Sequence, residues 1–173
     1  MRRILVFSVL ICLMINLSAQ SDKFEFDTRN YIGGSLSLQL GTVILFNITP
    51  HYGFYLTPRL SAGAGLSYLY YNNASPAPTQ PNTLNIYGGS LFMRFDIFDQ
   101  LYVHAENELL TYKLGKNGPQ ILSNNVLIGA GYKQFFSMMT NDNVYLMVLF
   151  NLNETQYTPY INPVIRMGVE FHF

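Results

Sequence analysis

The chain has 173 residues, with 10 basic and 10 acidic side chains, one cysteine and 15% aromatic residues. This length corresponds to one domain. The balanced charge without a basic cluster excludes a nucleic-acid-binding protein, and a single cysteine excludes an intramolecular disulfide and a cysteine-based metal site.

The chain begins with the pattern of a secretory signal peptide. Met1-Arg2-Arg3 is positively charged, and the apolar run Ile4–Leu17 is followed by small residues. The run is shorter than the ~20 apolar residues of a membrane-spanning helix. We expect cleavage after Ala19, which makes 1–19 the signal peptide and 20–173 the mature domain. Cys12 leaves lipoprotein processing as an alternative, although it lies inside the apolar run.

After a polar lead-in, Gln20–Asn30, segments that alternate between apolar and small or polar residues predict β-strands, because successive strand side chains point to opposite faces. The predicted strands are Tyr31–Leu40, Ile44–Tyr55, Leu60–Tyr71, Leu84–Asp96, Leu101–Leu114, Asn124–Phe136, Asn143–Leu152 and Asn162–Phe173. The predicted connections are Gly41-Thr42, Leu56–Arg59, Asn72–Thr83, Phe98–Gln100, Gly115–Gln120, Met138–Asp142 and Asn153–Tyr160. Gly, Pro, Asn and Asp in these connections are typical turn residues.

The last strand alternates most clearly. One face carries Ile165, Met167, Val169, Phe171 and Phe173, and the other carries Arg166, Gly168, Glu170 and His172. A closing strand that ends in Phe resembles that of bacterial outer-membrane β-barrels, and the chain is similar to the small OmpX-like proteins. The resemblance implies an all-β fold, an eight-stranded antiparallel up-and-down transmembrane β-barrel in the outer membrane of a Gram-negative bacterium. It also implies that the assembly machinery reads Val169, Phe171 and Phe173.

The composition of the two strand faces agrees with a membrane barrel. The mature sequence has no apolar run long enough for a membrane helix, so a membrane protein of this sequence must close its backbone hydrogen bonds in a barrel. One face carries large apolar residues and suits lipid, whereas Gly, Ser and scattered charges suit a narrow packed interior. A soluble eight-stranded barrel, with its apolar face inside, is the alternative. Tyr68 and Tyr70 are expected at the outer membrane boundary, and Phe171 and Phe173 at the inner one.

Two strands do not follow the pattern cleanly. Asn143–Leu152 is apolar on both faces, so its inward face is not assigned from sequence. Asn107 falls on the predicted lipid face, which indicates a bulge or a position at the membrane boundary.

Strand parity places the charged side chains inside, because an unpaired charge facing lipid costs ~2–4 kcal/mol at mid-membrane. This set is Arg94, His104, Glu106, Glu108, Lys133, Arg166, Glu170 and His172. Arg94 lies opposite Glu106 if the hairpin turn has three residues and opposite His104 if it has five. Both registers leave Arg94 within diagonal reach of Glu106, so we expect an Arg94–Glu106 pair. We interpret the set as an ion network that fills the barrel.

The functional alternatives are a barrel enzyme that hydrolyses or transfers acyl chains of lipid A and a narrow passive channel. His104 and Glu106 share a face, but we expect no Ser–His–acid set on adjacent strands. His51, His104 and His172 could bind metal only if the register aligned them, so no metal and no cofactor are expected. We therefore expect a monomeric, non-enzymatic outer-membrane protein with a structural or surface-interaction role.

The expected partners are outer-membrane lipid, lipopolysaccharide and the assembly machinery. A surface role would use the loops Asn72–Thr83 and Asn153–Tyr160, which display Pro, Asn, Thr and Tyr.

Overall fold

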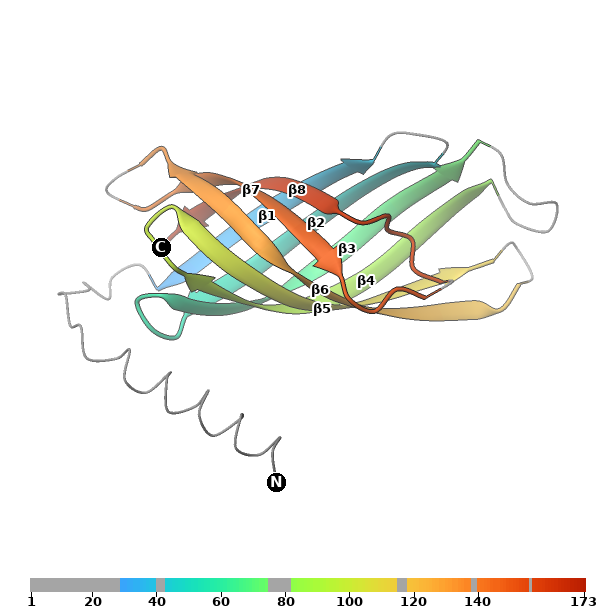
Figure 1. The fold of residues 1–173 in the computed structure, drawn as a ribbon, viewed down its shortest axis with the longest axis horizontal. Coiled ribbons are helices and arrows are strands. Elements are labelled where there is room, and N and C mark those ends of the chain that lie inside the picture. The colour runs from blue at the N-terminus through green and yellow to red at the C-terminus, as the bar shows by residue number, and fades with distance from the viewer. Residues whose placement is uncertain (1–28, 40–42, 75–81, 115–117, 138–139, 156) are drawn as a thin grey trace, which may run out of the picture.

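The computed structural model describes residues 29–39, 43–74, 82–114, 118–137, 140–155 and 157–173. Their strands close into one antiparallel barrel in sequence order (Figure 1). The strands are β1 (Asn30–Gln39), β2 (Val43–Tyr55), β3 (Leu60–Asn73), β4 (Thr83–Asp96), β5 (Leu101–Lys113), β6 (Gln120–Phe135), β7 (Asn143–Asn151) and β8 (Val164–His172). Because β1 pairs with both β2 and β8, the predicted eight-stranded antiparallel barrel is confirmed.

Some predicted features lie outside the described residues. They are the signal peptide 1–19, most of the lead-in Gln20–Asn30, the turn Gly41-Thr42 and parts of the connections Asn72–Thr83, Gly115–Gln120 and Met138–Asp142. Within the described part of the chain, no helix is long and apolar enough to cross a bilayer.

Several strand boundaries differ from the prediction, by up to four residues. β6 begins at Gln120 rather than at Asn124, because its ladder with β5 continues to the pair Lys113–Gln120. β8 begins at Val164 rather than at Asn162. Pro163 has no N–H to donate to a ladder, and the Asn162 side chain instead donates from Nδ2 to the Asn151 carbonyl oxygen at 3.0 Å.

The first and last residues of the barrel meet at one end, which we call the termini end. Asn30 N donates to Phe173 O at 3.1 Å, and Phe173 N donates to Asn30 O at 2.9 Å. The opposite end, with the β1–β2, β3–β4, β5–β6 and β7–β8 connections, is called the loop end. The backbone therefore leaves no open edge where the chain closes on itself.

β7 alternates as regularly as the other strands. Its inward residues are Asn143, Tyr145, Met147, Leu149 and Asn151, and its outward residues are Val144, Leu146, Val148 and Phe150. Asn143 and Asn151 are the polar residues of the inward face. The residues between them are apolar on both faces and do not distinguish inside from outside.

Asn107 faces outward, as its parity predicts, and of the two alternatives, a bulge or a boundary position, the bulge is wrong. The ladders of β5 with β4 and β6 run through Asn107 without interruption. Its Nδ2 donates to Asn124 Oδ1 on the same outward surface at 2.8 Å. A cross-strand amide pair therefore meets part of its hydrogen-bonding need.

The interior has two layers of different composition, and large apolar side chains join the small and ionic ones that the sequence predicts. Toward the loop end, the inward residues include the fully buried Leu45, Leu69, Ile86 and Leu110, which we call the apolar layer. The ionic side chains lie nearer the termini end. Leucine and isoleucine fill this narrow space without introducing polar groups that need partners.

Four inward aromatic rings each lie over a glycine of the neighbouring strand. The register pairs are Tyr31–Gly53, Gly63–Phe92, Tyr102–Gly131 and Tyr145–Gly168. A Cβ atom at any of these glycines would overlap the paired ring. Glycine allows this close approach because it has no side chain. Each of the four consecutive hairpins contributes one ring and one glycine, so every strand takes part.

We expect Gly131→Ala to lower the free energy of unfolding by about 1–3 kcal/mol, because the added methyl group must displace the buried Tyr102 ring. The matched control is Gly34→Ala, whose added Cβ would meet only ordinary contacts at 3.9 Å from Pro50 Cα and Thr49 O. This control should change stability by less than about 1 kcal/mol. Urea unfolding of the refolded variants measures both effects, and equal losses would contradict the proposed ring–glycine packing.

Candidate functional site

Arg94 of β4 lies among the four rings that pack on glycines. Its Cζ atom is 5.9 Å from the Tyr31 ring centroid, 5.1 Å from Phe92, 5.1 Å from Tyr102 and 5.0 Å from Tyr145. All four distances fall within the range of cation–π attraction, which strengthens when the cation is desolvated. The rings therefore surround a buried guanidinium with electron-rich faces.

Arg94 is bound by two polar partners as well. Its Nη1 forms an ion pair with Glu170 of β8, and its Nε donates to Nδ1 of His104 on β5 at 3.1 Å. Arginine has no acceptor, so the His104 Nδ1 must accept. The other ring nitrogen, Nε2, then carries the proton and donates to Glu106 Oε2 at 3.1 Å. His104 is thus a neutral imidazole with both nitrogens engaged.

The contacts continue from Glu106 toward the loop end. Arg166 Nη1 donates to Glu106 Oε2 at 2.8 Å, and Arg166 Nη2 lies 3.7 Å from Glu108 Oε1. On the other side of Arg94, His51 Nε2 is 3.0 Å from Glu170 Oε1. We call these connected residues the lumen cluster: His51, Arg94, His104, Glu106, Glu108, Arg166 and Glu170.

Glu108 is held by hydroxyl groups at the border of the apolar layer. Ser67 Oγ donates to Oε1 at 2.6 Å, and the Tyr160 hydroxyl donates to Oε2 at 2.7 Å. Tyr160 precedes β8 in the connection from β7, yet its side chain is buried inside the barrel. This connection therefore closes the loop end of the lumen on the β8 side.

The charged residues that parity places inside are all buried, but they do not all join the cluster. Lys133 forms a separate pair with Asp96, with Nζ 2.7 Å from Oδ2. The His172 ring stacks near Tyr31 and Tyr55, with centroid distances of 5.3 and 6.1 Å. Val169, Phe171 and Phe173 point outward, as the alternation predicts.

The expected Arg94–Glu106 pair is wrong. The longer turn places Arg94 opposite His104, and the carboxylate of Glu170 reaches Arg94 from β8. Glu106 pairs instead with Arg166 of β8. The length of a hairpin turn fixes the register of two neighbouring strands only. It therefore cannot identify side chains that meet across the lumen.

Sequence reasoning also missed several members of the site. Tyr31 and Tyr102 have the same parity as inward neighbours on their own strands, so alternation could have identified them. His51 was considered only as a metal ligand. Tyr160 lies outside the strands, and no periodic signal marks it.

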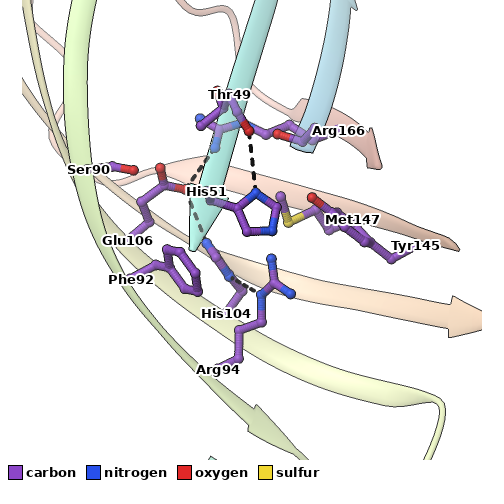
Figure 2. A pocket seen from close by; sticks show the side chains of 11 residues that line it. Thr49, His51, Ser90, Phe92, Arg94, His104, Glu106, Tyr145, Met147 and Arg166 are labelled. Atoms are coloured by element: carbon purple, nitrogen blue, oxygen red, sulfur yellow. Dashed lines mark hydrogen bonds and ion pairs between the residues drawn. The ribbon is translucent and has the colours of Figure 1, made fainter. Parts of the chain in front are cut away.

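A cavity of about 10 Å³ lies within the lumen cluster (Figure 2). It is large enough for about one water molecule. Ser90, His104 and Glu106 line it from the adjacent strands β4 and β5, so the expectation that no Ser, His and acid meet on adjacent strands is wrong. However, a serine nucleophile needs a base with a free ring nitrogen, and Arg94 and Glu106 occupy both nitrogens of His104.

Among the described residues, no group of three or more His, Cys, Asp or Glu side chains could hold a metal ion. The three histidines are separated by other groups. His51 contacts Glu170, His104 contacts Arg94 and Glu106, and His172 packs against tyrosines.

The sequence matches no known protein-family model and no curated protein. Among solved structures, the barrel is similar to the N-terminal β-barrel domain of Pseudomonas aeruginosa OprF, with 15% identity and a TM-score of 0.49, over 85% of this chain and 100% of that one. It is also similar to the translocator domain of the autotransporter NalP from Neisseria meningitidis, with 12% identity and a TM-score of 0.41, over 99% and 98% of the two chains. The barrel assignment rests on the strand pairing itself.

A double-mutant cycle tests the ion pairs of the lumen cluster. We expect Arg94→Met alone to cost roughly 3–5 kcal/mol of unfolding free energy, because the buried Glu170 carboxylate loses its arginine and keeps only His51 as a partner. The coupling between Arg94→Met and Glu170→Gln should clearly exceed the ~0.5 kcal/mol seen for independent sites. The matched cycle with Glu106→Gln should show weaker coupling. Urea unfolding measures both cycles, and the reverse order would refute the cross-lumen pairing.

Proposed function

We propose that this chain is an integral outer-membrane β-barrel protein of a Gram-negative bacterium, with a structural or surface-interaction role and no catalytic activity. The supporting observation is the inverted distribution of side chains. Leu66, Leu91 and Leu122 are each 70% exposed, whereas Arg166 and Glu108 are 1% and 0% exposed. Hydrocarbon stabilises such an exterior, while the closed ring of strand ladders pairs the backbone without an open sheet edge.

The lengths of the strands and the positions of aromatic side chains agree with a bilayer. β7 and β8 have 9 residues each, and about 9–11 residues at a ~45° tilt cross the hydrocarbon core. Phe136, Phe171 and Phe173 are exposed near the termini end, and Tyr68, Tyr70 and Tyr87 are exposed toward the loop end. Aromatic side chains of membrane proteins concentrate at the two headgroup boundaries.

The filled lumen supports a structural role over a passive channel. The apolar layer lies in the loop-end half together with buried side chains such as Asn47 and Asn125, and the lumen cluster occupies the half nearer the termini. A conducting barrel needs a continuous aqueous path, whereas eight-stranded barrels have interiors just wide enough for side chains.

The state of His104 supports a non-enzymatic role over lipid A hydrolysis or acyl transfer. A general base must reach the proton that it removes. His104 is instead held by a guanidinium on one side and a carboxylate on the other, within a cavity too small for an acyl chain.

The export signal and the closing strand complete the proposal. Cleavage of 1–19 would deliver the chain to the periplasm, where outward-facing Val169, Phe171 and Phe173 would be read by the assembly machinery, as in OmpX-like proteins. Outer-membrane lipid and lipopolysaccharide would then surround a monomeric barrel. The surface role falls to the loop end, where β4, β5 and β6 extend beyond β7 and β8 (Figure 1).

Cysteine labelling tests the membrane orientation of the outer surface. The mature chain has no thiol once Cys12 leaves with the signal peptide, so single cysteines can be placed freely. In lipid nanodiscs, we expect Leu91→Cys to be protected from a water-soluble maleimide, because this outward side chain lies against lipid. The exposed loop variant Glu154→Cys is the control and should be labelled fully. Equal labelling of both variants would indicate a barrel whose exterior faces water.

An acyl-release assay tests the absence of catalysis. Refolded protein given lipid A and phospholipids should release or transfer no acyl chains, as followed by mass spectrometry. Turnover that His104→Ala or Glu106→Ala abolishes would replace the structural role with the lipid A enzyme.

A further inference from the structure

The lumen cluster contains more acidic than permanently basic groups. Arg94 and Arg166 supply two positive charges, and Glu106, Glu108 and Glu170 supply three carboxyl groups, all of them buried. If every carboxyl group is ionised, one negative charge remains uncompensated in a low-dielectric interior, which is strongly unfavourable. One additional proton makes the cluster neutral, and the hydrogen-bond partners identify where it is bound.

The carboxyl groups are surrounded by donors, as ionised groups require. Glu106 Oε2 accepts from Arg166 and His104. Glu170 Oε1 faces Arg94 and His51.

Glu108 follows the same rule through its hydroxyl partners. Asn47 Nδ2 donates to the Tyr160 oxygen at 3.2 Å, so the phenolic proton is free to point at Glu108. Ser67 supplies the second donor. Each carboxyl group therefore has donors that fit its ionised form, and His104 is excluded as the proton site because its Nδ1 accepts from Arg94.

His51 has the opposite surroundings. Its Nδ1 lies 3.3 Å from the carbonyl oxygen of Thr49, and its Nε2 lies 3.0 Å from the carboxylate of Glu170. A carbonyl and a carboxylate can only accept hydrogen bonds, so both ring nitrogens must donate. We propose that His51 is the proton-binding site of the lumen, an imidazolium that serves as the third cation of the lumen cluster.

The groups that face His51 from β1, β4, β7 and β8 are one carboxylate, the arginine paired with it, and neutral aromatic rings. Glu170 of β8 lies between His51 and Arg94 of β4, so one carboxylate faces two cations. From β4, the Phe92 ring lies perpendicular to the His51 ring with 5.6 Å between the centroids. Tyr31 of β1 and Tyr145 of β7 place their rings at 6.3 and 6.2 Å.

The remaining charged groups around the same cavity cancel one another. His104 and Glu106 of β5 and Arg166 of β8 line it together with His51 (Figure 2). His104 is neutral, and Glu106 is paired with Arg166. Arg94 also lines the cavity and is paired with Glu170, so the imidazolium beside Glu170 supplies the third positive charge that the three carboxylates of the cluster require.

Histidine-selective ¹⁵N NMR of the refolded protein tests this assignment directly. The chain has three histidines, so Gln substitutions of His104 and His172 assign the His51 signals by elimination. At pH 7 we expect both His51 ring nitrogens to carry protons and only Nε2 of His104 to do so. A singly protonated His51 overturns the proposal, and an infrared band of a protonated carboxyl group that is lost in Glu108→Gln would move the proton to Glu108.

A charge-removal variant provides the second test. In Glu170→Gln, the two arginines are balanced by Glu106 and Glu108 alone, so we expect His51 to lose its additional proton and show the spectrum of a neutral imidazole. The matched control, Glu154→Gln in the exposed β7–β8 connection, should leave both nitrogens protonated. A His51 spectrum that is unchanged by Glu170→Gln would show that this carboxylate does not hold the proton. If Glu170→Gln does not refold, the spectrum of the unmodified protein still decides the question.

Discussion

The aromatic rings inside this barrel are arranged around one guanidinium group. Arg94 is surrounded by one aromatic ring from each hairpin, and each ring can lie where it does only because the paired strand offers a glycine. All eight strands therefore contribute a ring or a glycine to the packing around a single buried cation. A shift of one register step in any hairpin would move a ring from its glycine and turn the opposite face of that strand outward.

Burying so many charges does not by itself favour folding, because the desolvation of an ion often exceeds the energy gained from its partner. For a barrel that spans a membrane, as we propose, the alternative is a charge that faces hydrocarbon, which costs more. The lumen cluster reduces the cost by giving each carboxylate more than one donor and by surrounding Arg94 with rings. The same arrangement leaves His104 without a free nitrogen, so the packing that stabilises the lumen also removes the base that hydrolysis would need.

Sequence alternation predicts the strands, their outward faces and the buried ions, because each of these depends only on parity within one strand. Partners across the lumen depend on how far neighbouring strands are staggered when the barrel closes, and parity contains no such information. Arg94 and Glu170 are separated by 76 positions and meet only after closure. The inward face of β7 is not evident from sequence, because most residues on both of its faces are apolar. Tyr160 is not evident either, because it lies in a connection that has no periodic pattern. The apolar layer fills interior space whose size is set by the closed barrel, so the sequence of a single strand does not predict it.

The division of the lumen into two layers makes the two ends of the barrel respond differently to water. At the termini end, a brief separation of strands exposes ions that water solvates well. At the loop end, the same separation exposes leucine and isoleucine, whose hydration is unfavourable. Backbone amides near Arg94 should consequently exchange with solvent through small local openings, whereas those beside Leu45 and Leu110 require larger ones. Unfavourable hydration of apolar side chains therefore resists opening at the loop end, whereas at the termini end the pairing of the buried charges does so.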